Sequence, residues 1–421
     1  MISAPPGASE SEANEVASPV PSSLSGFLRQ WARRARSGES GVLPVLGGLI
    51  LIVVIFQVQS PVFLSPANLT NLLVQGAVFV LLGMAEVFVL LLGEIDLSIG
   101  FVAGIGGGVA AILLASPYNL PWWAALGAGL VATAAIGAVQ GTLVTRLGLP
   151  SFVVTLAGLL GWEGVLITMI DHSPSASGGV VRISNNVVND LVNGNLSPLA
   201  GWIGMILVVS AYALATLGGE QKRRKRGLSA LPWSIAMLKV GITALAGVVL
   251  VLICNTNRGH FVSLRGVPWV VPIVLAVFAG WTFLLGRTRF GRYVYAIGGN
   301  AEAARRAGIN LLRVRTIAFT LSGLTAGAGG IIYASRLGSM SVGIDGGTLV
   351  LYAVAAAVIG GTSLFGGRGK ALHAVLGGLV IATVYNGMGL LGMGAASQYM
   401  VTALVLVAAV TVDAFARRSR N

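Results

Sequence analysis

The feature that most constrains this chain is a succession of apolar runs, each close to the roughly 20 residues that an α-helix needs to cross a bilayer. The runs do not alternate between apolar and polar residues, as membrane β-strands do. Backbone groups in lipid must bond to one another, which leaves helices or closed barrels as spanning structures. We therefore predict an all-α polytopic membrane protein.

Composition supports lipid as the natural solvent of this chain. Hydrophobic residues make up 55% of the 421 residues and charged residues only 10%, and the mean hydropathy is +0.86. A soluble domain normally carries about a quarter charged residues. These charges are too few to cover a water-exposed surface of this size.

About twelve runs are candidate spans. They cover residues 42–59, 72–92, 99–115, 122–144, 152–170, 200–217, 234–254, 268–286, 315–334, 348–363, 372–391 and 398–414. Residues 42–421 are thus predicted to form a transmembrane domain. Residues 1–41 are predicted to be a disordered cytoplasmic tail that ends in a basic anchor at Arg29, Arg33, Arg34 and Arg36.

The distribution of basic residues predicts the orientation. Cytoplasmic loops of membrane proteins carry an excess of Lys and Arg, and an even number of spans places both termini in the cytoplasm. Of the 27 Lys and Arg, only Arg182, Arg258, Arg265 and Arg336 fall in predicted external segments, with Lys239 near a helix end. We predict a multi-pass membrane protein with both termini in the cytoplasm.

The net charge of +13 is accordingly assigned to cytoplasmic loops, and no nucleic-acid partner is predicted. Cys254 is the only cysteine, and three scattered histidines give no metal-ligand spacing. Five consecutive basic residues, Lys222–Arg226, are interpreted as an anchor on anionic lipid headgroups, with a dedicated binding site as the alternative. Residues 171–198 form a long polar external segment that is either a docking surface or a solvated loop.

The loop 287–315 contains a short helix signature. Asn300 suits an N-cap, Glu302 the first turn, and Gly308 a C-terminal stop. About two turns are too few for stability in isolation, so the helix must pack on something. The segment consists of Asn300, Ala301, Glu302, Ala303, Ala304, Arg305, Arg306, Ala307 and Gly308, and it is typical of a docking helix, with a self-contained surface turn as the alternative.

Four ordered motifs carry a resemblance to a known family. They are RYVYAIGGN (292–300) with the following EA and AGIN, EIDLSIG (94–100), PSFVVTLAG (150–158) and VIGGTSL (358–364). Together they resemble the permease subunits of sugar ABC importers of the ribose/xylose/arabinose class. The likeness is greatest to xylose-type permeases, because Glu94 precedes Ile-Asp-Leu-Ser and a basic insert lies at Lys222–Arg226.

The resemblance implies that residues 42–421 are a transmembrane permease domain in the bacterial plasma (inner) membrane. It also implies partners and an activity. Residues 300–308 would be the coupling helix that sits in a groove on a cytoplasmic ATPase subunit. An extracytoplasmic binding protein would deliver a monosaccharide, with a pentose such as xylose expected, to a permease homodimer. ATP and Mg would belong to the partner, since Gly369-Lys370-Ala371 is no phosphate-binding loop. We predict that the chain binds no cofactor and is not an enzyme.

Two glycine-containing breaks between spans are candidates for hinges or for the transport pathway. One contains Glu94, Asp96, Ser98 and Gly100; the other contains Gly360, Gly361, Thr362 and Ser363. Irregular backbone at membrane depth requires protein or water around it. For Asp96, structural capping and direct substrate contact remain alternatives. The breaks share spacing, either as a weak internal repeat or by chance in a chain of 59 glycines.

Glu86 and Glu163 lie within predicted spans, where a carboxylate is costly. They are interpreted as interhelical hydrogen-bonding groups, with a proton-coupling site as the alternative. A secondary transporter driven by an ion gradient would use Glu86, Asp96 or Glu163. A membrane scaffold that transports nothing is a third possibility.

Overall fold

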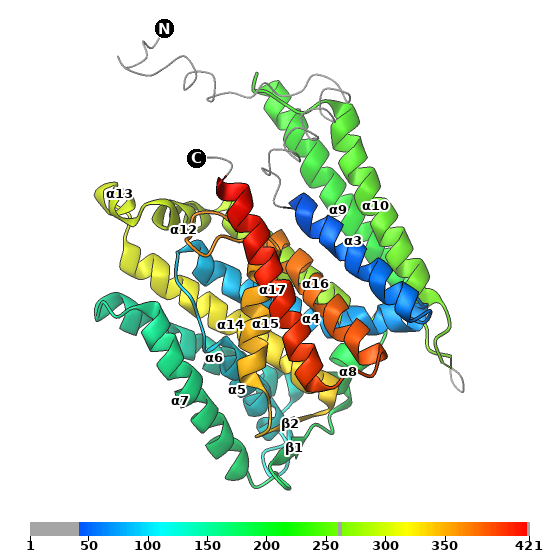
Figure 1. Cartoon of the computed structure of the whole chain (residues 1–421), viewed down its shortest axis with the longest axis vertical. Helices are drawn as coiled ribbons and strands as arrows, with labels where there is room; N and C mark the ends of the chain where they lie inside the picture. The colour runs from blue at the N-terminus through cyan, green and yellow to red at the C-terminus, as the bar shows by residue number, and fades with distance from the viewer. Residues whose placement is uncertain (1–41, 260–262, 419–421) are drawn as a thin grey trace. The chain divides into compact units, whose positions relative to one another are not determined.

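The computed structural model describes residues 42–259 and 263–418, and the predicted tail and basic anchor at 1–41 lie outside the described residues. Helices dominate, and the one sheet among these residues is a pair of short antiparallel strands that lie far apart in the sequence (Figure 1). Each of the twelve apolar runs forms a helix. The all-α membrane class predicted from the sequence is therefore confirmed.

Within the described part of the chain, eight helices are long and apolar enough to cross a membrane. They are α4 (Pro66–Leu91), α6 (Trp122–Arg146), α7 (Ser151–Asp171), α9 (Pro198–Lys225), α10 (Trp233–Asn255), α11 (Val270–Arg287), α14 (Leu311–Leu337) and α16 (Ala371–Leu390). The apolar parts of α3 (Val42–Gln59), α5 (Ile99–Leu114) and α15 (Gly346–Ile359) are shorter. The last helix is α17 (Ala395–Arg418). The count of twelve spans stays a prediction.

The larger of two compact units comprises, among the described residues, 42–198, 253–259 and 263–418. Its centre is α4, which is buried along most of its length, and α14, which packs on α4, α5 and α6. Helices α15 and α16 pack on each other and on α4, while α7 covers α5 and α3 covers α16. Figure 1 shows α14 and α15 beside α4 and α5 in this unit.

The two ends of this unit differ. At one end, here named the strand-pair end, β1 (Val180–Arg182) pairs antiparallel with β2 (Ser339–Ser341), Val181 opposite Met340. A short helix, α8 (Asn186–Asn193), packs there on α14. At the other end, named the α13 end, lie α12 (Arg289–Gly299) and α13 (Ala301–Arg306). Helices α8 and α12 and this strand pair were not predicted from the sequence.

The smaller unit described here is the helical pair α9 and α10 (residues 199–252). Few side chains of either helix are buried, as expected of helices whose solvent is lipid. The basic turn between them is ordered by its own contacts. Glu220 accepts a hydrogen bond from the Leu231 amide at 2.9 Å, and the Arg224 guanidinium lies 4.9 Å from the centre of the Trp233 ring.

Glycine sets the distance between the central helices. A Cβ added at Gly137 of α6 would overlap the carbonyl oxygen of Phe319 in α14, and one at Gly330 of α14 would overlap that of Ala103 in α5. Backbones in membrane proteins approach this closely only through small residues. A reciprocal amide pair adds polar contact between α4 and α16, because Asn68 and Asn386 exchange hydrogen bonds of 2.8 and 3.0 Å.

We expect Gly137→Ala to destabilise the protein by about 1–3 kcal/mol, because an extra methyl group in a packed contact forces backbone shifts. The matched control is Gly127→Ala in the same helix, where an added Cβ meets nothing within 4 Å. That control should be neutral or slightly stabilising, since alanine is the better helix former. Thermal unfolding of both variants in detergent measures the difference. Equal melting temperatures would contradict the packing argument.

Candidate functional site

The predicted short helix in the loop 287–315 is present as α13. The Asn300 side chain caps it by accepting a hydrogen bond from the Ala303 amide at 2.9 Å. Gly308 ends it with a positive φ of 82°. Helix α12 precedes it directly, and the Tyr295 hydroxyl in α12 donates to the Gly369 carbonyl at 2.7 Å.

Charge contacts hold the exposed surface of α13 in one conformation. Glu302 accepts two hydrogen bonds from Arg305, of 2.8 and 2.9 Å, and one from Arg306 of 3.1 Å. The hydrogen bonds from Arg305 and then Arg306 lower the pKa of Glu302, which keeps the carboxylate charged. Ala304, in contrast, is only 4% exposed and packs on its own chain. The helix therefore presents Glu302, Ala303, Arg305 and Arg306 as its free face.

Three separate segments meet without side chains just before α13. A Cβ at Gly298 would overlap the carbonyl oxygen of Leu91 and lie 2.5 Å from the Gly367 amide nitrogen. That amide donates to the Leu91 carbonyl at 2.9 Å. A Cβ added at Gly366, which has a positive φ, would likewise overlap the backbone of Gly93 and the carbonyl oxygen of Gly298. We name this contact of Gly93, Gly298, Gly366 and Gly367 the glycine hub.

The hub leads directly into the first predicted break, where residues 93–98 lie without helical structure between α4 and α5. The Asp96 carboxylate accepts hydrogen bonds from the Ser98 amide (2.9 Å) and hydroxyl (2.6 Å). The Ser98 hydroxyl in turn accepts one from the Gln140 amide of α6 at 2.8 Å. Asp96 and Ser98 are buried, so this irregular backbone is surrounded by protein.

Helices α5 and α15 both begin inside the bundle, and their first turns touch. They contain 16 and 14 residues, fewer than the roughly 20 that span a bilayer. A Cβ at Gly100 in α5 would overlap the carbonyl oxygen of Gly346 in α15. Gly100 therefore lies against the start of α15, while Glu94, which precedes it in the break, forms an ion pair with Arg315 at 3.3 Å.

The second predicted break lies at the α13 end of α15. A Cβ at Gly360 would overlap the His373 carbonyl oxygen in α16, and Gly361 has a positive φ of 108°. Thr362 and Ser363 are buried, and the Ser363 amide donates to the Arg368 carbonyl at 2.8 Å. Both predicted breaks thus reach the glycine hub, the first through Gly93 and the second through residues 366–367.

The two intramembrane acids differ in surroundings. Glu86 is fully buried in α4; one of its oxygens accepts a 3.4 Å hydrogen bond from the Asp96 amide and the other has no partner among the described residues. Glu163 is half-buried in α7. No group of three potential metal ligands occurs among the residues that the structure describes. Cys254 is buried as a free thiol.

A polar cavity that was not predicted from the sequence opens between α4, α14, α15, α16 and α17, in the half of the bundle toward the strand-pair end. Its volume is about 220 Å³, many times the roughly 10–15 Å³ that one water needs. Four of the eight tyrosines line it, namely Tyr333, Tyr352, Tyr385 and Tyr399. Tyrosines recurring near the ends of apolar runs were the only signal in the sequence.

Comparison with known proteins places this architecture in a transport family. The chain belongs to the family described as "Branched-chain amino acid transport system / permease component", whose model matches residues 68–410. This match covers most of the larger unit, including the glycine hub and the cavity, as well as the pair α9 and α10.

The most similar relatives described here are permease proteins for sugars. The chain is 35% identical over 414 residues to the xylose transport system permease protein XylH of Escherichia coli (strain K12), covering 97% of this chain and 99% of the relative. It is 36% identical over 385 residues to XylH of Haemophilus influenzae, covering 90% and 98%. The ribose import permease protein RbsC of Escherichia coli (strain K12) is 30% identical over 387 residues, covering 92% and 95%.

No solved structure matches the chain. The relatives confirm the predicted resemblance to permease subunits of sugar ABC importers, with xylose permeases among the most similar. The chain is a multi-pass membrane permease subunit and not an enzyme. The roles assigned to individual residues remain predictions.

We expect Glu86→Gln to change the free energy of unfolding by less than about 1 kcal/mol, because the neutral amide keeps the oxygen that accepts from Asp96. Glu86→Ala should cost more, since it leaves that buried amide and a cavity unfilled. Thermal unfolding in detergent compares the two variants. A Glu86→Gln variant as unstable as Glu86→Ala would show that the negative charge itself is needed.

Proposed function

We propose that this chain is the membrane-spanning subunit of an ATP-driven importer that translocates a monosaccharide, specifically a pentose such as D-xylose. The names of the relatives support a sugar as substrate, and the two XylH proteins support xylose in particular. The chain supplies the path through the membrane. ATP and Mg are bound by a partner ATPase.

The observation that carries this proposal is the construction of α13 and its attachment. An exposed, charge-braced helix of six residues follows directly on the glycine hub, which touches the ends of α4 and α12 and the segment after α15. A partner that displaces α13 would therefore displace the backbone of α4 and the 93–98 segment. This is what coupling between an ATPase and a transport path requires.

The orientation follows from charge. The α13 end carries Arg287, Arg289, Arg292, Arg305, Arg306, Arg313 and Arg315, whereas the strand-pair end carries few basic residues. Basic loops face the cytoplasm, so the ATPase meets the α13 end of a bacterial inner-membrane protein with both termini in the cytoplasm. An extracytoplasmic sugar-binding protein binds at the strand-pair end.

A second copy of this chain completes the translocation unit in the proposal, and each copy presents one α13 to one ATPase. The exposed apolar faces of α9 and α10 contact lipid, and Lys222–Arg226 contacts anionic headgroups. A secondary transporter remains the alternative function. It is less favoured because the Asp96 carboxylate already accepts hydrogen bonds from the Ser98 amide and hydroxyl.

The proposed function is tested in proteoliposomes that contain this chain, its ATPase and its binding protein. We expect ATP hydrolysis to rise when D-xylose is added with the binding protein, and labelled xylose to accumulate only with ATP. Stimulation by D-ribose or D-allose instead would keep the class and correct the sugar. Uptake by the chain alone that collapses with the proton gradient would establish the secondary transporter.

The glycine hub gives a sharper test of coupling. Gly298→Ala should insert and assemble normally but lower xylose uptake at least about tenfold, because the added methyl group separates α12 from Leu91 and Gly367 and costs roughly 1–3 kcal/mol. Gly299→Ala is the matched control, since its Cβ meets nothing within 4 Å. Uptake that is equally normal in both variants would remove the hub from the coupling route.

A further inference from the structure

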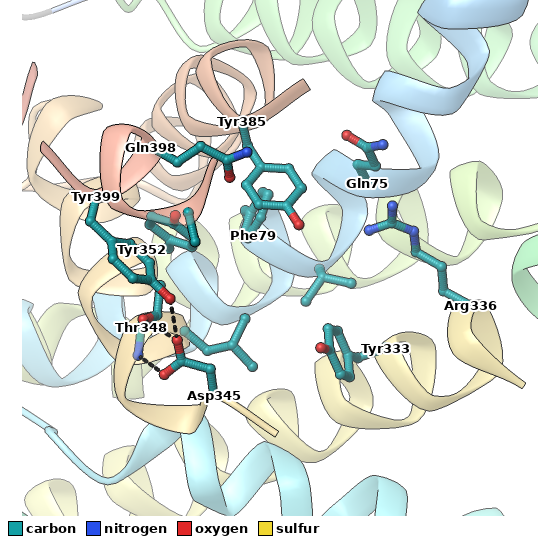
Figure 2. A pocket seen from close by; sticks show the side chains of 13 residues that line it. Gln75, Phe79, Tyr333, Arg336, Asp345, Thr348, Tyr352, Tyr385, Gln398 and Tyr399 are labelled. Atoms are coloured by element: carbon teal, nitrogen blue, oxygen red, sulfur yellow. Dashed lines mark hydrogen bonds between the residues drawn. The ribbon is translucent and has the colours of Figure 1, made fainter. Parts of the chain in front are cut away.

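The cavity toward the strand-pair end, here named the tyrosine pocket, has the composition of a binding site inside an otherwise apolar bundle. Aromatic and polar side chains from five helices and the segment before α15 converge on it. They are Gln75, Phe79, Tyr333, Arg336, Asp345, Thr348, Tyr352, Tyr385, Gln398 and Tyr399 (Figure 2). Polar groups inside membrane bundles mark substrate paths because they are costly otherwise.

The aromatic rings of the tyrosine pocket hold one another in place. Phe79 meets Tyr352 edge to face with ring centres 5.2 Å apart, and it meets Tyr385 similarly at 5.7 Å. Tyr352 and Tyr385 are 6.3 Å apart in the same kind of arrangement. Rings fixed in this way present apolar surface without a large loss of conformational entropy when a ligand binds.

One acceptor in the tyrosine pocket is equally fixed. The Asp345 carboxylate caps α15 by accepting from the Thr348 amide at 2.9 Å, and it also accepts from the hydroxyls of Thr348 and Tyr399. Every one of its contacts is a hydrogen bond from a neutral donor. Figure 2 shows this carboxylate at the wall of the cavity beneath Tyr399.

Donors without partners complete the set. Among the described residues, neither the Arg336 guanidinium nor the hydroxyls of Tyr333 and Tyr385 make a hydrogen bond or an ion pair that would occupy them. Arg336 lines the cavity from α14, on the side away from Asp345 (Figure 2). A half-buried guanidinium without a counter-ion is costly in a membrane bundle, so a ligand that accepts its hydrogen bonds would bind favourably.

We propose that the tyrosine pocket is a binding site for a single neutral monosaccharide that enters from the strand-pair end. Arg336 donates hydrogen bonds to the ring or hydroxyl oxygens of the sugar, and Asp345 accepts hydrogen bonds from its hydroxyls. The proposal rests on the proposed function and deepens it by assigning residues to the substrate. Aromatic faces pack on the apolar C–H face of a sugar ring, and the polar groups at both sides satisfy its hydroxyls.

Charge selects a neutral ligand. Among its lining residues the pocket has one cationic side chain, Arg336, and one anionic side chain, Asp345. A sugar acid would pair with Arg336 but would place its carboxylate in a cavity already negative at Asp345. A zwitterionic amino acid is the competing ligand chemistry, since it could pair with both charges, and it is therefore included in the test.

The position of Asp345 connects the pocket to the coupling route. Asp345 immediately precedes Gly346, whose carbonyl oxygen lies against Gly100 at the start of α5. A displacement of the 93–98 segment at the glycine hub would move Gly100 and, through this contact, the start of α15. The acceptor that holds the sugar would then shift relative to Arg336 on α14, which would release the sugar.

The first measurement is ligand protection in the purified full-length permease. In a Cys254→Ser background, Gln398→Cys is labelled with a water-soluble maleimide in the presence of D-xylose, D-xylonate or L-leucine. Arg182→Cys is the matched control, because this position is exposed at the strand-pair end and lies outside the pocket. We expect D-xylose alone to slow labelling of Gln398→Cys and no ligand to affect Arg182→Cys.

The second measurement is uptake in the reconstituted complex. Arg336→Gln and Tyr385→Ala should raise the apparent KM for D-xylose about tenfold, the effect of losing roughly 1.4 kcal/mol of binding. Tyr385→Phe should lie between Tyr385→Ala and the unsubstituted chain, because it keeps the ring and removes the hydroxyl. Tyr212→Ala, in the lipid-exposed helix α9, is the control and should leave KM unchanged.

These outcomes separate the site from the proposed function. Protection by L-leucine rather than D-xylose would overturn the sugar assignment of the pocket. Absence of protection by any ligand, together with an unchanged KM in Arg336→Gln and Tyr385→Ala, would overturn the pocket while normal ATP-dependent xylose uptake upheld the proposed function. Absence of uptake by the unsubstituted complex would instead count against the proposed function.

Discussion

The structure depends on the close approach of helix backbones, which glycine makes possible. Gly137 against Phe319, Gly100 against Gly346 and Gly298 against Leu91 bring main chains together with no side chain between them. In a bilayer these contacts do two things at once. They supply the van der Waals packing that holds helices together where lipid gives no hydrophobic drive, and they surround irregular segments such as 93–98 with protein.

Much of this architecture could be predicted from the sequence, because lipid imposes strong local rules. Each apolar run became a helix, and Asn300, Glu302 and Gly308 marked the limits of α13 through capping chemistry that acts within a few residues. Helices α8 and α12 were missed for the opposite reason. Both are short amphipathic helices in segments whose glycine, asparagine and charge content favours loops, and packing on neighbouring helices decides their structure.

The candidate site divides in the same way. The breaks around Asp96 and Gly360 were visible because glycine and polar residues interrupt apolar sequence, but their meeting at Gly298 depends on segments roughly 70 to 270 residues apart along the chain. The tyrosine pocket could not be predicted, because it too is formed by residues that are distant in the sequence. Each lining residue, taken alone, is an ordinary tyrosine or glutamine near a helix end, and only the fold brings Tyr333, Tyr385 and Asp345 to one cavity.

The distance along the bundle between the tyrosine pocket and α13 has an evolutionary consequence. No residue that lines the pocket belongs to the glycine hub or to the free face of α13. Substitutions can therefore retune which ligand is accepted without disturbing how the energy source is engaged. A gene duplicate of such a permease could acquire a new sugar through a handful of changes at one end while remaining compatible with its inherited motor at the other.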